Sequence, residues 1–178
     1  SQGLFKWLGW SELGTLAGFF EGYRVPDGYV LLREAEPGDF LCVLLEGRVE
    51  VRKSDGQGRD KVIATLAAGK TIGEMSLIDG ERHSASCVAV TDMLIAALTR
   101  TQLERLQQAT PRLAVEVLWR VARILSQRLR QTSGRLVAHI RGNQLTASLD
   151  LHTDVKADFL ETFVNVILKP RGMDYRLQ

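Results

Sequence analysis

The stretch of sequence over residues 70–90 reads KTIGEMSLIDGERHSASCVAV. Gly73 lets the backbone come close to a neighbouring group, and a very short helical turn between two strands is expected to follow it. The N–H groups of Glu74, Met75 and Ser76 begin this turn and form a small anion site. The Glu74 carboxylate cannot help to hold a phosphate, but it can accept a hydrogen bond from a sugar hydroxyl. The stretch therefore favours a ligand that joins a phosphate to a ribose.

Short apolar runs separated by turn signals surround this stretch. Strands are expected over residues 29–32, 40–51 with an interruption at 46–47, 61–66, 84–90 and 93–98. Val49 and Val51 alternate with charged residues, as in a half-exposed strand. Many short strands with turns at intervals of about 8–12 residues predict an all-β barrel or sandwich.

Helical periodicity flanks the strands on both sides. Residues 4–20 repeat apolar side chains at steps of three and four. Thr101 and Glu104 form the predicted capping box of a helix that follows the last strand. A last amphipathic helix is expected over residues 154–169, and Pro170 stops it.

The longest predicted helix begins at Pro111, a residue favoured at the first helical position. Its apolar face consists of Leu113, Val117, Leu118, Val121, Ile124, Leu125 and Leu129. Ser133 and Gly134 are expected to end it. The face is wide enough to cover the barrel and still meet a partner, so this helix is a candidate for dimerisation.

Several of these features together resemble the cyclic-nucleotide-binding domains of the catabolite activator protein and the regulatory subunit of protein kinase A. Residues 73–78 and 84–86 resemble their phosphate-binding cassette, and residues 37–41 and 44–51 resemble their central hairpin. Leu4 and Phe5 are similar to their N-terminal helix. Residues 101–132 are similar to the two helices that follow the barrel.

The resemblance covers about residues 3–132 and implies a mainly β fold with flanking helices. The expected architecture is a double-stranded β-helix, or jelly-roll, barrel followed by a long C-terminal helix. The implied segments are an N-terminal helical segment (1–22), a ligand-binding barrel (23–100), hinge and dimerisation helices (101–132) and a C-terminal extension with one amphipathic helix (133–178).

The family pattern also implies a ligand site. Its residues would be Ile72, Gly73, Glu74, Met75, Ser76, Arg82, His83, Ser84 and Ala85. Gly73 and the amides after it would hold the cyclic phosphate, and Glu74 would bond the ribose 2′-hydroxyl. Ser84 lies where a small residue of the family contacts the phosphate.

The sequence departs from the family at one position of this site. His83 stands where the family has an arginine that neutralises the phosphate, and Arg82 stands where proline is frequent. A histidine near its reference pKa of about 6.5 is mostly neutral at pH 7 and cannot form the two-pronged contact of a guanidinium. Arg82 can replace it only if the loop shifts, because adjacent residues that enter a strand point to opposite faces.

Three functions are compatible with this departure. The first is a non-catalytic sensor that binds a cyclic mononucleotide, cAMP before cGMP, between the cassette and residues 111–131 and signals through this C-terminal helix. The second is a degenerate barrel that binds no nucleotide and serves for dimerisation or protein docking. The third is a sensor of another anionic ligand.

The sequence carries no catalytic signature, so an enzyme is not expected. Residues 64–71 resemble the end of a P-loop, but Ala64 replaces its first glycine. The three histidines have no metal-ligand spacing, and no metal or cofactor is expected beyond the nucleotide ligand. Cys42 and Cys87 lie in apolar alternating stretches and are predicted to be reduced core thiols.

The charge pattern bears on partners. The net charge is +2, which is too small to imply a nucleic acid. Residues 101–141 hold eight arginines against two glutamates, and we interpret this face as solvated. A homodimer through residues 112–129 is expected, with direct DNA binding disfavoured because residues 133–178 show no helix-turn-helix.

No membrane span or signal peptide is visible, and the expected location is cytoplasmic. The chain starts at Ser1 rather than Met, which is compatible with an output domain or partner protein beyond it.

Overall fold

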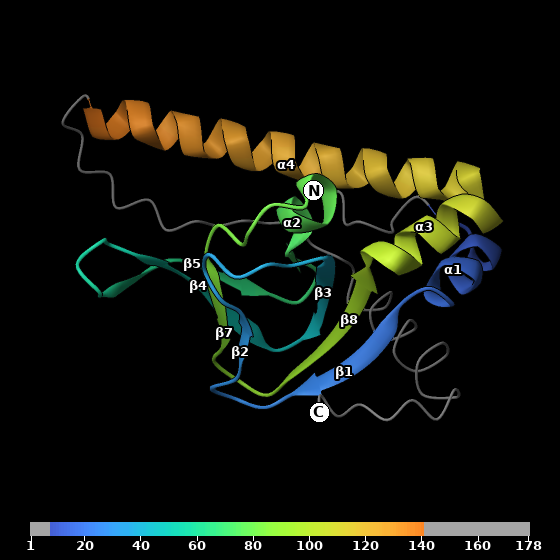
Figure 1. The fold of residues 1–178 in the computed structure, drawn as a ribbon, viewed down its shortest axis with the longest axis horizontal. Coiled ribbons are helices and arrows are strands. Elements are labelled where there is room, and N and C mark those ends of the chain that lie inside the picture. Colours follow the sequence, from blue (N-terminus) through green and yellow to red (C-terminus); the bar gives the residue numbers. More distant parts are fainter. Residues whose placement is uncertain (1–7, 141–178) are drawn as a thin grey trace.

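The computed structural model describes residues 8–140 and shows two antiparallel four-stranded sheets that face each other (Figure 1). The first sheet has the order β1-β8-β3-β6 and the second β2-β7-β4-β5. The strands are β1 (Glu21–Val25), β2 (Val30–Leu32), β3 (Phe40–Glu46), β4 (Arg48–Ser54), β5 (Asp60–Ala67), β6 (Thr71–Ile72), β7 (Ser86–Ala89) and β8 (Met93–Thr99). The helices are α1 (Trp10–Ala17), α2 (Glu74–Asp79), α3 (Arg100–Ala109) and α4 (Pro111–Ile140).

This architecture confirms the predicted jelly-roll barrel with a long C-terminal helix. The expected strands are present with bounds that differ by a few residues, whereas β1 and β6 were not predicted. The burial of β1 does not alternate regularly and the strand contains Gly22, so its sequence lacks a clear period of two. Pairing with β8 along all five of its residues makes it a strand.

Two central strands, β3 and β8, bury both of their faces. In β3, Leu41 and Val43 pack against the helices, whereas Cys42 and Leu44 face the barrel interior. In β8, Leu98 packs toward the helices in the same way. Because helices cover one side of this sheet, both strands are continuous apolar runs.

The barrel interior also contains the two cysteines. Cys42 and Cys87 are buried and free, which confirms the prediction of reduced core thiols. Burial raises the pKa of the Cys87 thiol to about 12 and also raises that of Cys42. Both are therefore protonated at neutral pH and serve as small apolar side chains.

The start of α3 differs from the prediction. The cap is Thr99, whose hydroxyl accepts the N–H of Gln102 at 3.2 Å, and Gln102 in turn accepts the N–H of Thr99 at 2.8 Å. The predicted pair Thr101 and Glu104 is wrong because both residues already lie inside the helix. A capping box accepts Gln as well as Glu at its third position, so the sequence contained two overlapping candidates.

The end of α4 also differs from the prediction. Ser133 and Gly134 do not end the helix, which continues to Ile140. One glycine in a helix costs about 1 kcal/mol, which a long helix tolerates when no proline follows. Residues 1–7 and 141–178, with the predicted helix over 154–169, lie outside the described residues.

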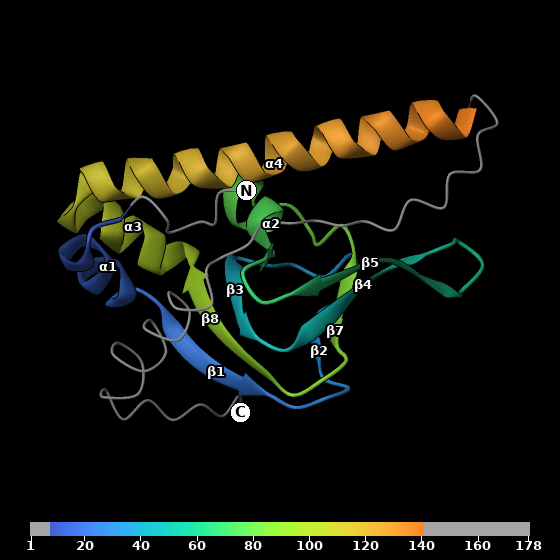
Figure 2. The same ribbon diagram turned by 180° about the vertical axis from the view of Figure 1, so that it is seen from behind.

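The long helix is placed where it can act on the predicted ligand site. In both views, α4 runs along one side of the barrel with α2 directly between them (Figures 1 and 2). α3 packs against α4 and α1 lies beside α3. Within residues 8–140, no helix has the length and apolar character needed to cross a bilayer.

Candidate functional site

Two glycines with left-handed backbone determine the shape of the predicted cassette. Gly73 precedes α2 with a φ of 79°, and Gly80 follows it with a φ of 75°. A Cβ on Gly73 would lie 2.5 Å from the carbonyl oxygen of Phe40, so only glycine lets β3 and the cassette approach this closely. The predicted short helical turn is thus confirmed as a six-residue helix.

The cassette helix is also held from outside the barrel. The N–H of Gly80 and the guanidinium of Arg100 both donate to the carbonyl oxygen of Ser76, each at 3.0 Å. Arg100 is the first residue of α3. The C-terminal end of α2 is therefore tied to the helix that packs against α4.

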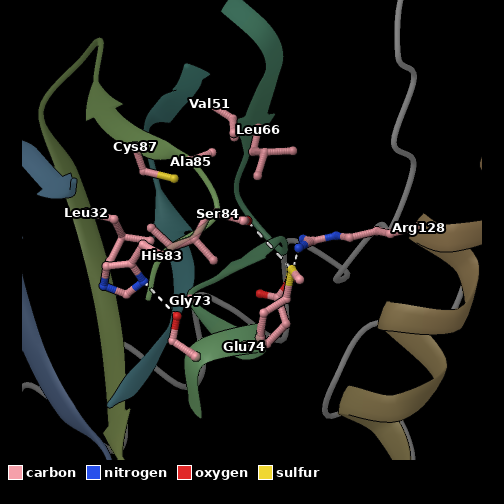
Figure 3. A pocket seen from close by; sticks show the side chains of 13 residues that line it. Leu32, Val51, Leu66, Gly73, Glu74, His83, Ser84, Ala85, Cys87 and Arg128 are labelled. Carbon is pink, nitrogen blue, oxygen red and sulfur yellow. Dashed lines mark hydrogen bonds and ion pairs between the residues drawn. The ribbon is translucent and has the colours of Figure 1, made fainter. Parts of the chain in front are cut away.

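A small pocket lies at the N-terminal end of α2 (Figure 3). Its lining residues are Leu32, Val51, Leu66, Ile72, Gly73, Glu74, Met75, Ser76, His83, Ser84, Ala85, Cys87 and Arg128. Eight of the nine predicted site residues are among them, and Arg82 is not. Its volume of about 90 Å³ is well below the roughly 300 Å³ at which ligand pockets begin.

Arg82 points away from this pocket, contrary to the expectation that it lines the site. Its side chain is exposed and donates to the carbonyl oxygen of Ala35 at 2.7 Å. The loop is held in this register because the N–H of His83 donates to the carbonyl oxygen of Glu36, and the N–H of Ala35 donates to that of His83, both at 2.9 Å. The loop has not shifted to let Arg82 replace the family arginine.

His83 points inward and is 6% exposed. Its Nδ1 lies 2.9 Å from the Ser76 hydroxyl, and its ring contacts Phe40 edge to face, with centroids 6.1 Å apart. Gly38 packs so closely on the imidazole that a Cβ there would lie 1.9 Å from Cε1. Burial lowers the pKa of His83 below its usual value, although the Glu36 carboxylate opposes the shift. The imidazole is therefore neutral at neutral pH.

Glu74 is the buried acid of the pocket, with 2% of the residue exposed. Its Oε1 accepts a charge-assisted hydrogen bond from Arg128, whereas its Oε2 is buried with no hydrogen-bond partner. A buried carboxylate oxygen without a donor costs free energy. A ligand hydroxyl that donates to Oε2 would recover this cost.

Arg128 reaches into the pocket from α4, although it belongs to the group of arginines whose face was interpreted as solvated (Figure 3). Its guanidinium also donates to the carbonyl oxygen of Thr71 at 2.6 Å. Burial lowers the pKa of Arg128 to about 10, so the side chain stays charged at neutral pH. One signal could have found it: Arg128 follows Val121 by seven residues, on the face of α4 that packs on the barrel. Leu129, predicted on that face, is instead 68% exposed.

A larger cavity of about 300 Å³ lies elsewhere in the barrel. It is lined by Tyr23, Tyr29, Leu31, Phe40, Cys42, Ile95, Ala97 and Thr99, none of which is a predicted site residue. The residues that line it include no pair of oppositely charged side chains such as Glu74 and Arg128. Among residues 8–140, no cluster of three or more His, Cys, Asp or Glu side chains could hold a metal ion.

Comparison with known proteins agrees with this geometry. The sequence model of a protein family, the cyclic nucleotide-binding domain, matches residues 23–110, from within β1 to just beyond α3. The structure is also similar to the crystal structure of a cyclic nucleotide-binding domain from Methylobacillus flagellatus, with 36% identity and a TM-score of 0.71 over 76% of each chain. The chain belongs to the cyclic nucleotide-binding domain family.

Regulatory proteins are among the relatives of this cyclic nucleotide-binding domain. The chain is 30% identical over 128 residues to the cyclic AMP receptor protein of Thermus thermophilus. It is 25% identical over 134 residues to a CRP-like cAMP-activated global transcriptional regulator of Mycobacterium tuberculosis. The chain spans 57% and 58% of the length of these two relatives.

Proposed function

We propose that this chain is a non-catalytic sensor domain that binds a cyclic mononucleotide, cAMP in preference to cGMP, at the pocket between the cassette and α4. The preference for cAMP rests on the names of the two regulators, which refer to that nucleotide. The residues proposed for binding are those of the cassette that line the pocket, from Ile72 to Ser76 and from His83 to Ala85.

The unpartnered Oε2 of Glu74 is the observation that carries this proposal. It is a buried acceptor beside a pocket whose floor is the start of α2. By helix geometry, the N–H groups of Glu74, Met75 and Ser76 have no acceptor within that helix. A cyclic nucleotide fits both features, because its ribose hydroxyl can donate to Oε2 and its phosphate can accept from these amides.

The size of the pocket links binding to α4. With Arg128 paired to Glu74, the volume of about 90 Å³ is too small for a nucleotide. Binding therefore requires Arg128 and the part of α4 that carries it to move. The ligand can shift the equilibrium between the two positions of α4 only by the difference between its affinities for them. This shift of α4 is the proposed output signal.

The decisive experiment is titration of the chain with cAMP and cGMP by calorimetry, together with thermal unfolding. We expect saturable heat with cAMP and a melting temperature that rises with its concentration, because a ligand that binds only the folded state stabilises it. cGMP should bind more weakly. If millimolar cAMP gives neither heat nor a shift in melting temperature, the chain is the non-binding module considered above.

A homodimer through α4 is the second part of the proposal. Val115, Trp119, Ala122 and Leu129 are exposed along α4 at steps that match a heptad seam, with Ser126 at the remaining position. An exposed tryptophan and leucine on one stripe are typical of an interface. This stripe faces away from the barrel, so the helix can bind a second copy while it covers the pocket.

We expect light scattering to give about twice the chain mass of 19.8 kDa. Leu129→Glu should shift the protein toward the monomer, because it places a charge in the seam. Gln131→Glu introduces the same charge at an exposed position outside the seam and should leave the mass unchanged. A wild-type protein that stays monomeric at tens of micromolar would refute the dimer.

A further inference from the structure

The pocket contains an unusual arrangement of charge. Of the described residues that line it, Glu74 is the acid and Arg128 is the only one with a positive charge, since His83 is neutral at neutral pH. A phosphate in this pocket would otherwise lie beside a buried carboxylate with no cation. Such a site would repel its ligand.

Neither neighbour on the loop before β7 can provide the missing charge. Arg82 is exposed and donates to the carbonyl oxygen of Ala35. His83 has its Nδ1 within 2.9 Å of the Ser76 hydroxyl and its ring enclosed by Gly38 and Phe40. Turning Arg82 inward would require breaking the two backbone hydrogen bonds of His83.

We propose that Arg128 supplies the positive charge that binds the phosphate of the cyclic nucleotide, so that in this chain the cation stands on α4 rather than on the cassette. The proposal rests on the function proposed above and assigns a further binding residue to the same site.

The position of Arg128 allows this role. Its guanidinium lies in the pocket, where it donates to Glu74 Oε1 and to the carbonyl oxygen of Thr71. A guanidinium has five N–H groups, and those released from Glu74 and Thr71 when α4 moves to admit the ligand can donate to a phosphate oxygen. Because the side chain is only 31% exposed, a charge-assisted bond here is stronger than at the surface.

Binding then exchanges the partners of Glu74 and Arg128. The ribose hydroxyl donates to Glu74 Oε2, and the phosphate accepts from Arg128 in addition to the amides at the start of α2. The charge of the ligand thereby acts directly on α4. A neutral ligand of the same shape would lack this attraction, so the position of α4 should depend on the phosphate.

The test compares cAMP with adenosine, which keeps the base and ribose but has no phosphate. We expect Arg128→Gln to weaken cAMP binding about 100-fold in calorimetry and adenosine binding less than about threefold. Arg128→Lys keeps the charge but not the planar fork, and an intermediate loss of about tenfold is expected for cAMP. Arg130→Gln, at an exposed position on the same helix, should change neither affinity.

The outcomes separate this inference from the proposed function. If wild type does not bind cAMP, the proposed function fails. If wild type binds cAMP and Arg128→Gln binds it equally well, only the role of Arg128 is overturned. If Arg128→Gln weakens cAMP and adenosine by the same factor, Arg128 acts by positioning Glu74 and does not bind the phosphate. Thermal unfolding of each variant confirms that it is folded.

Discussion

Gly73→Ala should remove ligand binding and lower the free energy of unfolding by about 3 kcal/mol. A non-glycine residue at a φ of 79° costs about 1–2 kcal/mol. The added Cβ would also lie 2.5 Å from the carbonyl oxygen of Phe40, which is backbone and can yield only if β3 or the cassette moves. Such a displacement in a packed region costs about 1–3 kcal/mol more. Urea unfolding measures the stability, and cAMP calorimetry measures the site.

Gly28→Ala is the matched control for this change. Gly28 has a φ of 80°, but a Cβ there would meet nothing within 4 Å. It should therefore cost only the backbone part, about 1–2 kcal/mol, and leave cAMP affinity unchanged. If the two variants lose equal stability and both bind cAMP as wild type does, Gly73 is not required for the close approach of β3 to the cassette.

Gly38→Ala should lower the free energy of unfolding by about 2 kcal/mol and disturb the pocket, although Gly38 has no positive φ. The new Cβ would lie 1.9 Å from Cε1 and 2.2 Å from Nε2 of His83. The imidazole cannot rotate freely, because Phe40 and the Ser76 hydroxyl enclose it. The imidazole must therefore leave its position and lose its hydrogen bond to Ser76. Because His83 lines the pocket, the affinity for cAMP should fall as well.

A double-mutant cycle isolates this contact. In a His83→Ala background the ring is absent, so Gly38→Ala should cost little. The coupling free energy measured by urea unfolding should then be about 1–3 kcal/mol. Additive losses from the two single variants would show that the imidazole adapts without leaving its place. In that case the close packing at Gly38 does not hold His83.

The two variants probe different parts of one site. Gly73 sets the distance between β3 and the cassette, and Gly38 sets the orientation of His83. With His83 held neutral and inward, the loop contributes shape rather than charge. The positive charge of the site then comes from α4, which makes the helix that covers the pocket a part of it.

Much of the fold could be predicted because its signals are local. The short strands show alternation or continuous apolar runs, and turn glycines separate them. The short turn after Gly73 was predicted because glycine allows the backbone to approach a neighbouring group closely, and the cassette residues were predicted from the resemblance to the family. Eight of the nine site residues line one pocket because they lie in two short stretches that β6, α2 and β7 bring together. By contrast, β1 depends on its partner strand, and the cap of α3 depends on where β8 ends.

The sequence by itself determined the barrel, the short helical turn after Gly73 and the order of the helices, because each depends on neighbours along the chain. Only the tertiary structure decided that Arg82 faces solvent, that His83 is buried, and that Arg128 meets Glu74 across 54 residues of sequence. That last contact depends on how α4 is rotated and docked on the barrel. Rotation and docking follow from the packing of the whole apolar face of α4, which no short stretch of sequence contains.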